Sequence, residues 1–477
     1  MINENDILTI LSATNQWWRS GNVTQDYAKP VKRFAYYEAM KILTHPDIRR
    51  MVLLTGARRI GKTTIMYQMI DALIQQGIKP ERILYVSLDH PMLKLSSINE
   101  ILKIYQQNIY PLDDVYCFFD EIQYADSWDS WLKTLYDTNK QCRIVATGSA
   151  SPILVDKASE SGVGRWTTLA IPTMSFYEYC GLLKLDLPEF DPDLKPTNLR
   201  TMPEREQNAI FQKLLPLLPH FNRYLLVGGF PELALSKDEA YAQRTLREDI
   251  VDKVLKRDIP ALYNIRSIVD LEKIFIYLCM HSSSIISIDT ISKELGGVTR
   301  PTVEKYIQYL ASANMIYISN PIDVTGKKIL KARPKIYIAD AAIRNAVLMK
   351  ENLLTDPTEM GIVAETAVYK HVRSFYYNLS ANVGYYRRST GKDNEIDIVV
   401  DYVNTQILIE VKYRENYSFN KNAPIITEAE NASRALVITK KENDYGPLEE
   451  NPLVYRIPAY AFLYLLGHAE KCGYKMI

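Results

Sequence analysis

A turn of fixed spacing between a buried strand and a helix constrains this chain most. After the apolar run 51–55, Gly56 and Gly61 lie five positions apart, and Lys62 and Thr63 follow at once. Glycines let the backbone wrap so that successive N–H groups converge on an anion. The helix that begins there adds its positive N-terminal end. The spacing therefore predicts a phosphate-binding turn.

The candidate nucleotide-binding residues cover the whole turn. We expect Lys62 to reach the β- and γ-phosphates and the Thr63 hydroxyl to bind Mg²⁺. No NKxD-type guanine reader follows a strand, so ATP is the expected nucleotide, with Mg²⁺ as cofactor. The predicted nucleotide-binding residues are Gly56, Ala57, Arg58, Arg59, Ile60, Gly61, Lys62, Thr63, Thr64 and Ser149.

A pair of carboxylates follows another apolar run. Asp120 and Glu121 come directly after the predicted strand 115–119. We expect Asp120 to hold Mg²⁺, directly or through water, and Glu121 to orient or deprotonate the attacking water. Two acidic residues that merely cap a strand are the alternative interpretation. Residues 147–149 (Thr-Gly-Ser) end a further strand, where a polar side chain could sense the γ-phosphate or simply form a turn.

The order of the predicted elements indicates the fold class. Apolar strand patterns at 51–55, 83–88, 115–119 and 143–147 alternate with helical patterns. This alternation predicts an α/β domain with a parallel sheet and crossovers on both faces.

These residues carry a resemblance to a known family. The stretches TGARRIGKTT, CFFDEIQYADSWDSWLKTLYD, VATGSAS and VGRWTTLAIPTMSFYEY resemble the AAA-like ATPases of the AAA_14 type. The rest of the chain, including GGFPE at 228–232, resembles the DUF4143 region that accompanies this ATPase. The resemblance implies a nucleotide-driven machine or switch. It also implies that Arg165, after Gly164, is a candidate catalytic phosphate-sensing or finger residue, in cis or in trans. A surface arginine is the alternative.

The pattern along the chain predicts five segments. Four prolines between positions 188 and 203 mark a linker, and later patterns change from helices to strands. The predicted segments are a helical lead-in (1–45), a P-loop domain (46–187), a linker and helical region (188–267), a winged helix (268–340) and an α/β domain (341–477).

The segment 268–340 has the order of a winged helix. Residues 287–295 and 299–313 form two helical patterns around a Gly-Gly turn, and two apolar strands follow. The basic residues expected on the wing, where they could contact DNA phosphates, are Lys327, Lys328, Lys331, Arg333 and Lys335. A solvated wing in a protein-interaction module is the alternative.

The last segment contains a carboxylate–lysine pattern. Asp397 lies thirteen residues before Glu410, and Lys412 follows Glu410 at the strand spacing of two. With Glu365 as a further ligand, this D…ExK pattern resembles the PD-(D/E)xK, restriction-endonuclease-like fold. That resemblance implies a Mg²⁺ site for phosphodiester cleavage. The alternatives are an ordinary surface hairpin and a nuclease-like domain that binds without cutting.

Composition excludes several other classes. The net charge of +1 argues neither for nor against nucleic acid. The five cysteines form no CxxC pair, which excludes an obvious zinc ribbon. No run approaches the ~18 apolar residues of a membrane span, and no signal pattern opens the chain, so we expect a cytoplasmic protein without membrane contact.

The sequence therefore predicts a Mg²⁺-dependent ATPase whose nucleotide state controls a winged-helix and nuclease-like C-terminal half. Two alternatives remain open at this point. One is an ATP-gated, metal-dependent DNA nuclease. The other is a non-catalytic nucleotide switch that binds a protein partner. A homo-oligomer would be required if Arg165 acts in trans.

Overall fold

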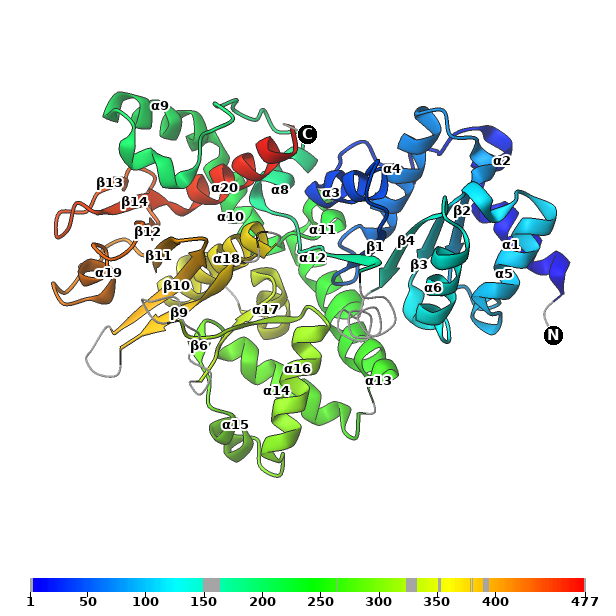
Figure 1. The fold of residues 1–477 in the computed structure, drawn as a ribbon. Coiled ribbons are helices and arrows are strands. Elements are labelled where there is room, and N and C mark those ends of the chain that lie inside the picture. Colours follow the sequence, from blue (N-terminus) through cyan, green and yellow to red (C-terminus); the bar gives the residue numbers. More distant parts are fainter. Residues whose placement is uncertain are drawn as a thin grey trace. The chain divides into compact units, whose positions relative to one another are not determined.

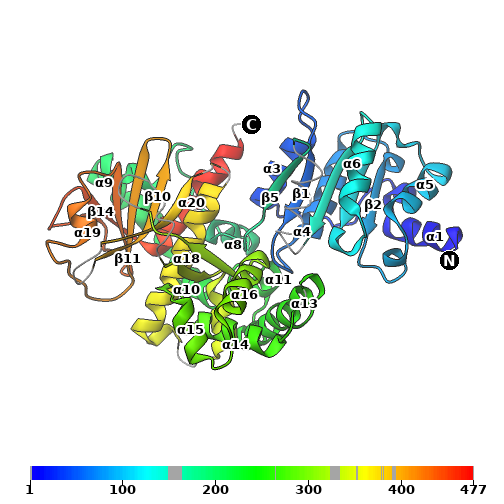
Figure 2. The same cartoon turned by 60° about the horizontal axis from the view of Figure 1, so that its bottom comes forward.

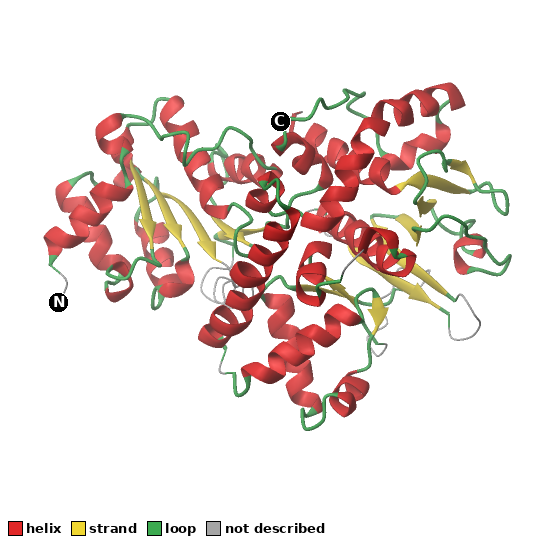
Figure 3. Cartoon of the chain, turned by 180° about the vertical axis from the view of Figure 1, so that it is seen from behind, coloured by secondary structure: helices red, strands yellow, loops and turns green. Residues whose placement is uncertain are grey.

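The chain forms two compact units, Met1–Pro172 and Thr173–Ile477. Figures 1 and 3 draw the computed structural model, in which both units contain helices and strands. The structure describes residues 3–148, 164–263, 265–322, 333–350, 353–377, 379, 381–388 and 394–475.

The first unit is built on a five-stranded sheet in the order β2-β3-β4-β1-β5, and all neighbouring strands are parallel. Its helices lie on both faces of the sheet (Figure 2). The predicted parallel α/β fold is therefore confirmed. Its elements are α1 (Glu4–Thr14), α2 (Trp17–Ser20), α3 (Phe34–Leu43), β1 (Met51–Thr55), α4 (Lys62–Gln75), β2 (Ile83–Ser87), α5 (Ile98–Asn108), β3 (Tyr116–Asp120), α6 (Trp128–Thr138), β4 (Arg143–Gly148) and β5 (Trp166–Ala170).

Strand β5 was not predicted from the sequence. β5 pairs in parallel with β1 at the edge of the sheet. Its sequence, WTTLA, is only partly apolar, and only one of its five residues is buried. An edge strand needs no continuous apolar run, because one of its sides has no neighbour. β1, by contrast, is buried at every position.

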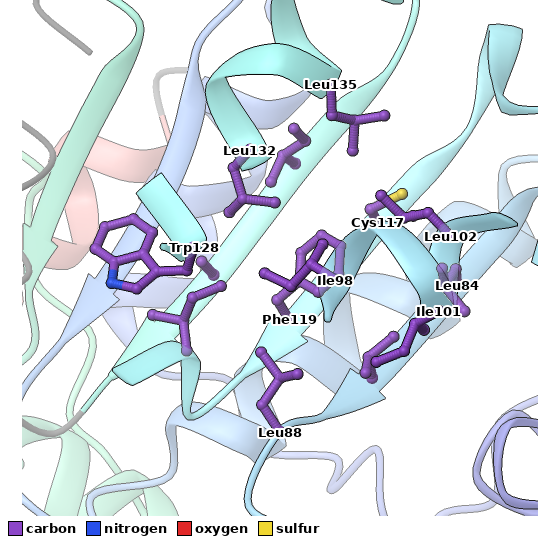
Figure 4. Packing of buried hydrophobic residues seen from close by; sticks show 14 of the residues in the cluster. Leu84, Leu88, Ile98, Ile101, Leu102, Cys117, Phe119, Trp128, Leu132 and Leu135 are labelled. Atoms are coloured by element: carbon purple, nitrogen blue, oxygen red, sulfur yellow. The ribbon is translucent and has the colours of Figure 1, made fainter. Parts of the chain in front are cut away.

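The core of the first unit lies between the sheet and the helices α1, α5 and α6. Figure 4 shows Ile98 of α5 and Leu132 of α6 packed beside Phe119 of β3. The spacing of apolar residues in α5 and α6 places them on one helix face, so burial of that face orients each helix on the sheet. This packing fixes the end of β3 that carries the acidic pair.

The N-terminal helices cover the free edge of this sheet. The indole nitrogens of Trp17 and Trp18 both donate to the carbonyl of Ile83, at 3.1 and 2.8 Å. The side chain of Asn15 bonds both backbone groups of Tyr85, at 2.8 and 2.6 Å. These bonds satisfy backbone groups of β2 that would otherwise form an open edge.

The second unit begins with helices and continues with a small antiparallel sheet, β6-β8-β7. Between residues 268 and 338 the order is helix, strand, helix, helix, strand, strand. This order differs from the predicted one only by the short strand β6. The elements are α8 (Phe176–Leu182), α9 (Glu204–Leu214), α10 (Leu218–Val227), α11 (Pro231–Leu235), α12 (Glu239–Thr245), two π-helical turns (Leu246–Val251 and Val254–Asp258), α13 (Ile259–Leu262), α14 (Ile268–Met280), β6 (Ser284–Ile285), α15 (Ile288–Glu294), α16 (Arg300–Ser312), β7 (Ile316–Ser319), β8 (Lys335–Ile338) and α17 (Ala341–Leu348).

A six-stranded sheet in the order β13-β14-β12-β11-β10-β9 completes this unit. Strands β9 to β11 are antiparallel, whereas β11, β12 and β14 run parallel. The elements are α18 (Pro357–Tyr377), β9 (Asn382–Arg387), β10 (Glu395–Tyr402), β11 (Thr405–Lys412), α19 (Pro424–Thr427), β12 (Arg434–Thr439), β13 (Gly446–Pro447), β14 (Val454–Pro458) and α20 (Ala459–Lys475).

The two sheets of the second unit are joined by backbone hydrogen bonds. Pro321, just after β7, forms a parallel bridge with Tyr385 of β9. Ile322 N donates to Tyr385 O at 2.8 Å, and Tyr385 N donates to Asn320 O at 3.2 Å. A side chain at Gly384 would collide with the Asn320 carbonyl, so the glycine permits this close approach. The strands of the small sheet are therefore fixed against the larger one.

A buried ion pair explains the GGFPE stretch. Lys370 Nζ lies 3.1 Å from Asp340 Oδ2, and both side chains are almost fully buried. Asp340 also accepts bonds from Thr173 (2.6 Å) and from the backbone of Gly229 (3.1 Å). A Cβ at Gly228 would collide with Asp340. Burial disfavours the charged carboxylate, but Lys370 and these donors outweigh it and lower the pKa of Asp340.

We predict that Leu132→Ala lowers the free energy of unfolding of the first unit by ~2–5 kcal/mol, since it leaves a cavity under the sheet. All five tryptophans, at positions 17, 18, 128, 131 and 166, lie in this unit, so urea unfolding followed by tryptophan fluorescence reports it. Leu95→Ala is the matched control, because that side chain is 79% exposed. Equal unfolding midpoints for the two variants would contradict this core.

Candidate functional site

The predicted phosphate turn connects β1 to α4. Gly56 and Gly61 have φ values of 152° and 95°, and Arg59 has a φ of 58°. A Cβ at Gly56 would collide with the backbone of Ile171, so only glycine fits there. The turn thus has the tight, partly left-handed backbone that the spacing predicts, and Thr64 is the third residue of the helix that follows.

Lys62 is folded back onto this turn. Its Nζ donates to the carbonyls of Gly56 at 3.0 Å and Ala57 at 2.9 Å, and the side chain is buried. These carbonyls hold the ammonium beside the N–H groups at the start of α4. Phosphate oxygens are stronger acceptors for an ammonium than peptide carbonyls, because they carry charge. Lys62 is therefore placed to exchange these partners for a bound phosphate.

Asp120 is held by three hydroxyl groups. Thr63 Oγ1 donates to its Oδ2 at 2.7 Å and Tyr85 OH donates to the same oxygen at 2.9 Å, while Thr147 Oγ1 donates to Oδ1. The carboxylate is 3% exposed. Burial and the charge of Asp120 raise the pKa of the Tyr85 phenol, which keeps it a donor. The structure thus brings together the two predicted Mg²⁺ ligands, Thr63 and Asp120.

Glu121 adopts an unusual backbone conformation at the end of β3. Its φ is 53°, which is uncommon for a residue with a side chain and costs about 1–3 kcal/mol. The Thr147 hydroxyl accepts its backbone N–H at 3.0 Å, and Gln123 Nε2 donates to Glu121 Oε2 at 2.5 Å. These bonds keep the two carboxylates adjacent but pointing to different partners. Such strain is typical of functional sites.

Arg33 braces the turn from the N-terminal segment. Its guanidinium donates to the carbonyls of Ile60 at 2.9 Å and Pro172 at 3.0 Å, and the side chain is buried. Arg58 reaches the hydroxyl of Tyr124 at 3.4 Å. Neither Arg33 nor Tyr85 was predicted from the sequence, because neither lies in a motif. Only pairing across the sheet or docking of the lead-in brings them to the site.

The residues at this site fit a Mg²⁺–nucleotide group. A hydroxyl and a carboxylate oxygen lie 2.7 Å apart, and hard oxygen donors of this kind suit Mg²⁺. The lysine and the helix N-terminus supply positive charge for phosphates beside them. The site can therefore hold a triphosphate with its metal and present Glu121 to a water. Ser149 lies outside the described residues.

The structure corrects one prediction at this site. Arg165 precedes β5, and Trp166 pairs with Met51 at the start of β1. The phosphate turn follows the other end of β1, about 16 Å away at 3.3 Å per residue. Arg165 instead donates two hydrogen bonds to Asp137, at 2.8 and 3.1 Å. Arg165 is therefore wrong as a finger for its own chain's site, and a role in trans stays a prediction.

A second group of charged residues forms in the second unit. Asp397 of β10 and Glu410 of β11 are neighbours, with Asp397 N donating to Glu410 Oε2 at 3.4 Å. Lys412 Nζ lies 2.5 Å from Glu410 Oε1. Glu365 of α18 reaches the same cluster. The structure thus brings together all four residues of the predicted nuclease-like site.

Lys335 lies at the centre of this cluster, which corrects its predicted place on a wing. Its Nζ lies 2.7 Å from Glu365, 2.7 Å from Glu395 and 3.0 Å from Asp397. The side chain is only 2% exposed. Lys335 and Glu395 are the members that sequence analysis did not assign to the site. Lys327, Lys328 and Lys331 lie outside the described residues, and Arg333 is exposed.

The buried carboxyl groups of this cluster have different pKa values. Burial, and then the charge of Asp397, raises the pKa of Glu365 to about 7 and that of Glu410 to about 8. Burial also opposes the charged form of Asp397, but Lys335 and Lys412 outweigh it and lower the pKa of Asp397. The two lysines thus hold one carboxylate ionised, while its neighbours bind protons more readily.

The cluster does not fit a divalent cation as it stands. A Mg²⁺ ion needs oxygen ligands at about 2.0–2.1 Å in near-octahedral geometry. The oxygens of Glu365, Glu395 and Asp397 already surround an ammonium. In the described part of the chain, no group of three or more His, Cys, Asp and Glu side chains is arranged to hold a metal ion.

Family models match parts of both units. Residues 48–180 match the family model AAA_14, described as an AAA domain. The matches at 218–354 and 360–460 are to domains of unknown function, DUF8612 and DUF4143. Residues 48–180 thus carry an AAA domain, and the chain resembles the AAA-like P-loop ATPases that carry a DUF4143 domain. GGFPE falls within the DUF8612 match rather than in the DUF4143 region to which the sequence reading assigned it. The first unit of this AAA-like protein has the P-loop NTPase fold.

Three relatives of this chain are uncharacterized proteins. Two come from Methanocaldococcus jannaschii. One is 27% identical and covers 77% of this chain and 75% of its own length. The other is 26% identical, with coverages of 92% and 90%. An uncharacterized protein of Haemophilus influenzae is 24% identical, with coverages of 65% and 72%.

Two solved structures show weaker likeness. The Aeropyrum pernix ORC1 protein in complex with DNA has a TM-score of 0.29 at 13% identity, covering 66% of this chain and 91% of its own. Domain III of the Thermotoga maritima replication initiation protein DnaA has a TM-score of 0.25 at 18% identity, with coverages of 49% and 98%. Scores this low carry no argument about function. Among the described helices, none is long and apolar enough to cross a membrane.

We predict that Tyr85→Phe weakens the Mg²⁺-dependent part of ATP affinity, because Asp120 loses a donor that orients it toward Thr63. A hydrogen bond to a charged group contributes about 1.5–3 kcal/mol, so the first unit should also unfold at lower urea. Fluorescent-nucleotide binding with Mg²⁺ and with EDTA measures the first effect. Tyr27→Phe, at a 47% exposed ring, is the control. Unchanged Mg²⁺ dependence in Tyr85→Phe would argue against this role.

Proposed function

We propose that this chain is a Mg²⁺-dependent ATPase whose nucleotide state controls its winged-helix and nuclease-like second unit. The observation that carries the proposal is the 2.7 Å contact between Thr63 and Asp120, directly beside Lys62 and Glu121. Residues from β1, α4, β3 and β4 meet there at the carboxyl ends of parallel strands, which is where such sheets bind ligands.

Each residue has a distinct role in the proposed reaction. The backbone N–H groups of residues 56–63 and the ammonium of Lys62 bind the phosphates. Thr63 and Asp120 hold Mg²⁺, directly or through water, and the bound ion would neutralise charge on the phosphate oxygens. Glu121 orients the attacking water and accepts its proton. Gln123 keeps the Glu121 carboxylate in place through its 2.5 Å hydrogen bond.

Lys62→Ala is expected to abolish ATP turnover through loss of phosphate binding. Glu121→Gln is expected to lower kcat by about 100- to 10,000-fold, the usual contribution of a general base, while ATP stays bound. Phosphate release and filter-bound nucleotide measure the two effects. Lys79→Ala and Glu100→Gln, at exposed positions of the same unit, are the matched controls. Normal hydrolysis by both site variants would refute the assignment.

The structure bears on what the second unit binds. Arg300 at the start of α16 forms ion pairs with Asp289 and Glu304, and Lys335 is buried away from any wing surface. Of the predicted wing residues that the structure describes, Lys335 is therefore not available to DNA phosphates. On α14, by contrast, Val269 and Met280 are 57% and 52% exposed. Ile276, 43% exposed, lies between them on the same helix face, and we propose that this apolar face meets a protein partner rather than DNA.

One experiment separates the two kinds of partner. Steady-state ATP hydrolysis by the wild-type chain is measured with and without duplex DNA at low salt, where phosphate contacts are strongest. Turnover that DNA leaves unchanged supports the protein-facing switch. Stimulation by DNA, lost at higher salt, would instead make the winged helix a DNA-binding element.

The nuclease alternative has one observation in its favour, the convergence of Asp397, Glu410 and Lys412. The ammonium of Lys335 among the same carboxylates opposes it. We therefore propose ATP hydrolysis, and not phosphodiester cleavage, as the activity of this chain.

A further inference from the structure

The cluster in the second unit contains its own cation. Lys335 extends from β8 into a group of carboxylates carried by α18 and β10. Its Nζ lies within 3.0 Å of Glu365, Glu395 and Asp397 at the same time. Of its three N–H donors, the ammonium uses two to bond Glu395 and Asp397, while Glu365 lies at ion-pair distance. The carboxylates of the cluster thus already surround a cation that belongs to the chain itself.

The position of this ammonium matters for metal binding. A divalent cation shared by Glu365 and Asp397 would need to lie about 2.0–2.6 Å from their oxygens. Those oxygens are 2.7 and 3.0 Å from Lys335 Nζ, so the ion and the ammonium would compete for one volume. Two positive charges that close repel each other strongly in a buried site. Only one of them can be present.

The backbone holds Lys335 in this place. β8 pairs with β7 along its whole length, from Ser319–Lys335 to Ile316–Ile338. β7 continues into the bridge between Pro321 and Tyr385, which joins the small sheet to β9. Tyr385 OH also donates to the carbonyl of Arg333, two residues before Lys335. Withdrawal of the lysine would therefore require displacement of a paired strand.

A second side chain of β8 reinforces the arrangement. Tyr337 OH donates to Glu365 Oε1 at 2.8 Å, and its ring stacks on Tyr369 of α18 with centroids 3.9 Å apart. Lys335 and Tyr337 are two residues apart on β8, so their side chains lie on the same face of the strand. The strand thus supplies both an ammonium and a hydroxyl to Glu365.

We propose that Lys335 replaces the divalent cation in the nuclease-like domain, so that the cluster is a metal-excluding joint between the two sheets of the second unit. Lys335 is a positioning residue: its ammonium pairs with carboxylates of α18 and β10 and so fixes β8 against both elements. The domain keeps the carboxylate–lysine arrangement of a metal site but uses it to hold its parts together. This inference is independent of ATP hydrolysis in the first unit.

Binding of Mn²⁺ without nucleotide tests the proposal on the full chain. Isothermal titration with Mn²⁺ compares the wild type, Asp397→Asn, Lys335→Met and the double variant Lys335→Met/Asp397→Asn. Subtraction of the Asp397→Asn trace removes any ion held at Asp120 in the first unit. We expect no Asp397-dependent Mn²⁺ binding in the wild type. Lys335→Met should gain Asp397-dependent Mn²⁺ binding, at least tenfold tighter than the weakest binding that the wild-type titration would detect.

Two control variants separate charge from folding. Lys335→Arg keeps a cation in the cluster and should bind no more Mn²⁺ than the wild type. Lys305→Met changes an exposed lysine of α16 and should also match the wild type. If Lys335→Met is unstable, its thermal midpoint should rise with Mn²⁺, whereas that of the double variant should not.

Two results would overturn the proposal. One is Mn²⁺ uptake by the wild-type chain that Asp397→Asn removes, which can be measured whether or not Lys335→Met folds. The other is a folded Lys335→Met variant with no gain in Mn²⁺ binding. Either result would leave the ATPase assignment intact, since Lys62 and Glu121 do not enter this test.

Discussion

The arrangement of the first unit depends on the burial of a single carboxylate, Asp120. A buried charge is costly unless hydrogen bonds compensate it. Hydroxyls from α4, β2 and β4 compensate this one, namely those of Thr63, Tyr85 and Thr147. Three elements that are distant in sequence must therefore meet at the end of β3. The parallel order β2-β3-β4-β1 provides that meeting point, since β3 lies between the strands that carry Tyr85 and Thr147.

In the second unit, buried charges are likewise compensated by partners from distant segments, and here the buried charges include lysines. Lys370 is buried against Asp340, and Lys335 is buried among three carboxylates. Breaking a buried ion pair costs ~3–5 kcal/mol because the remaining partner is left unpaired. Each lysine therefore links segments that are far apart in the chain. Lys370 joins α18 to the residue before α17, and Lys335 joins the small sheet to the large one.

Much of the first unit could be predicted because its motifs are local. The turn from Gly56 to Thr63 and the pair after β3 are each read from a few adjacent residues. Tyr85, Arg33 and β5 were not predicted, since their roles arise from strand pairing and from docking of the lead-in. The second unit was harder for the same reason. Its four nuclease-like residues were found from the D…ExK spacing, but Lys335 is on a strand sixty-two residues before Asp397 and looks like a wing residue.

The most direct test of the central claim is a single-turnover experiment with the wild-type chain in excess over ATP. The Thr63–Asp120 pair beside Glu121 predicts that all bound ATP is converted to ADP and phosphate in the presence of Mg²⁺. With EDTA in place of Mg²⁺, the nucleotide should remain ATP. Bound ATP that stays intact with Mg²⁺ through long incubation would contradict the account and leave a nucleotide-binding switch without hydrolysis.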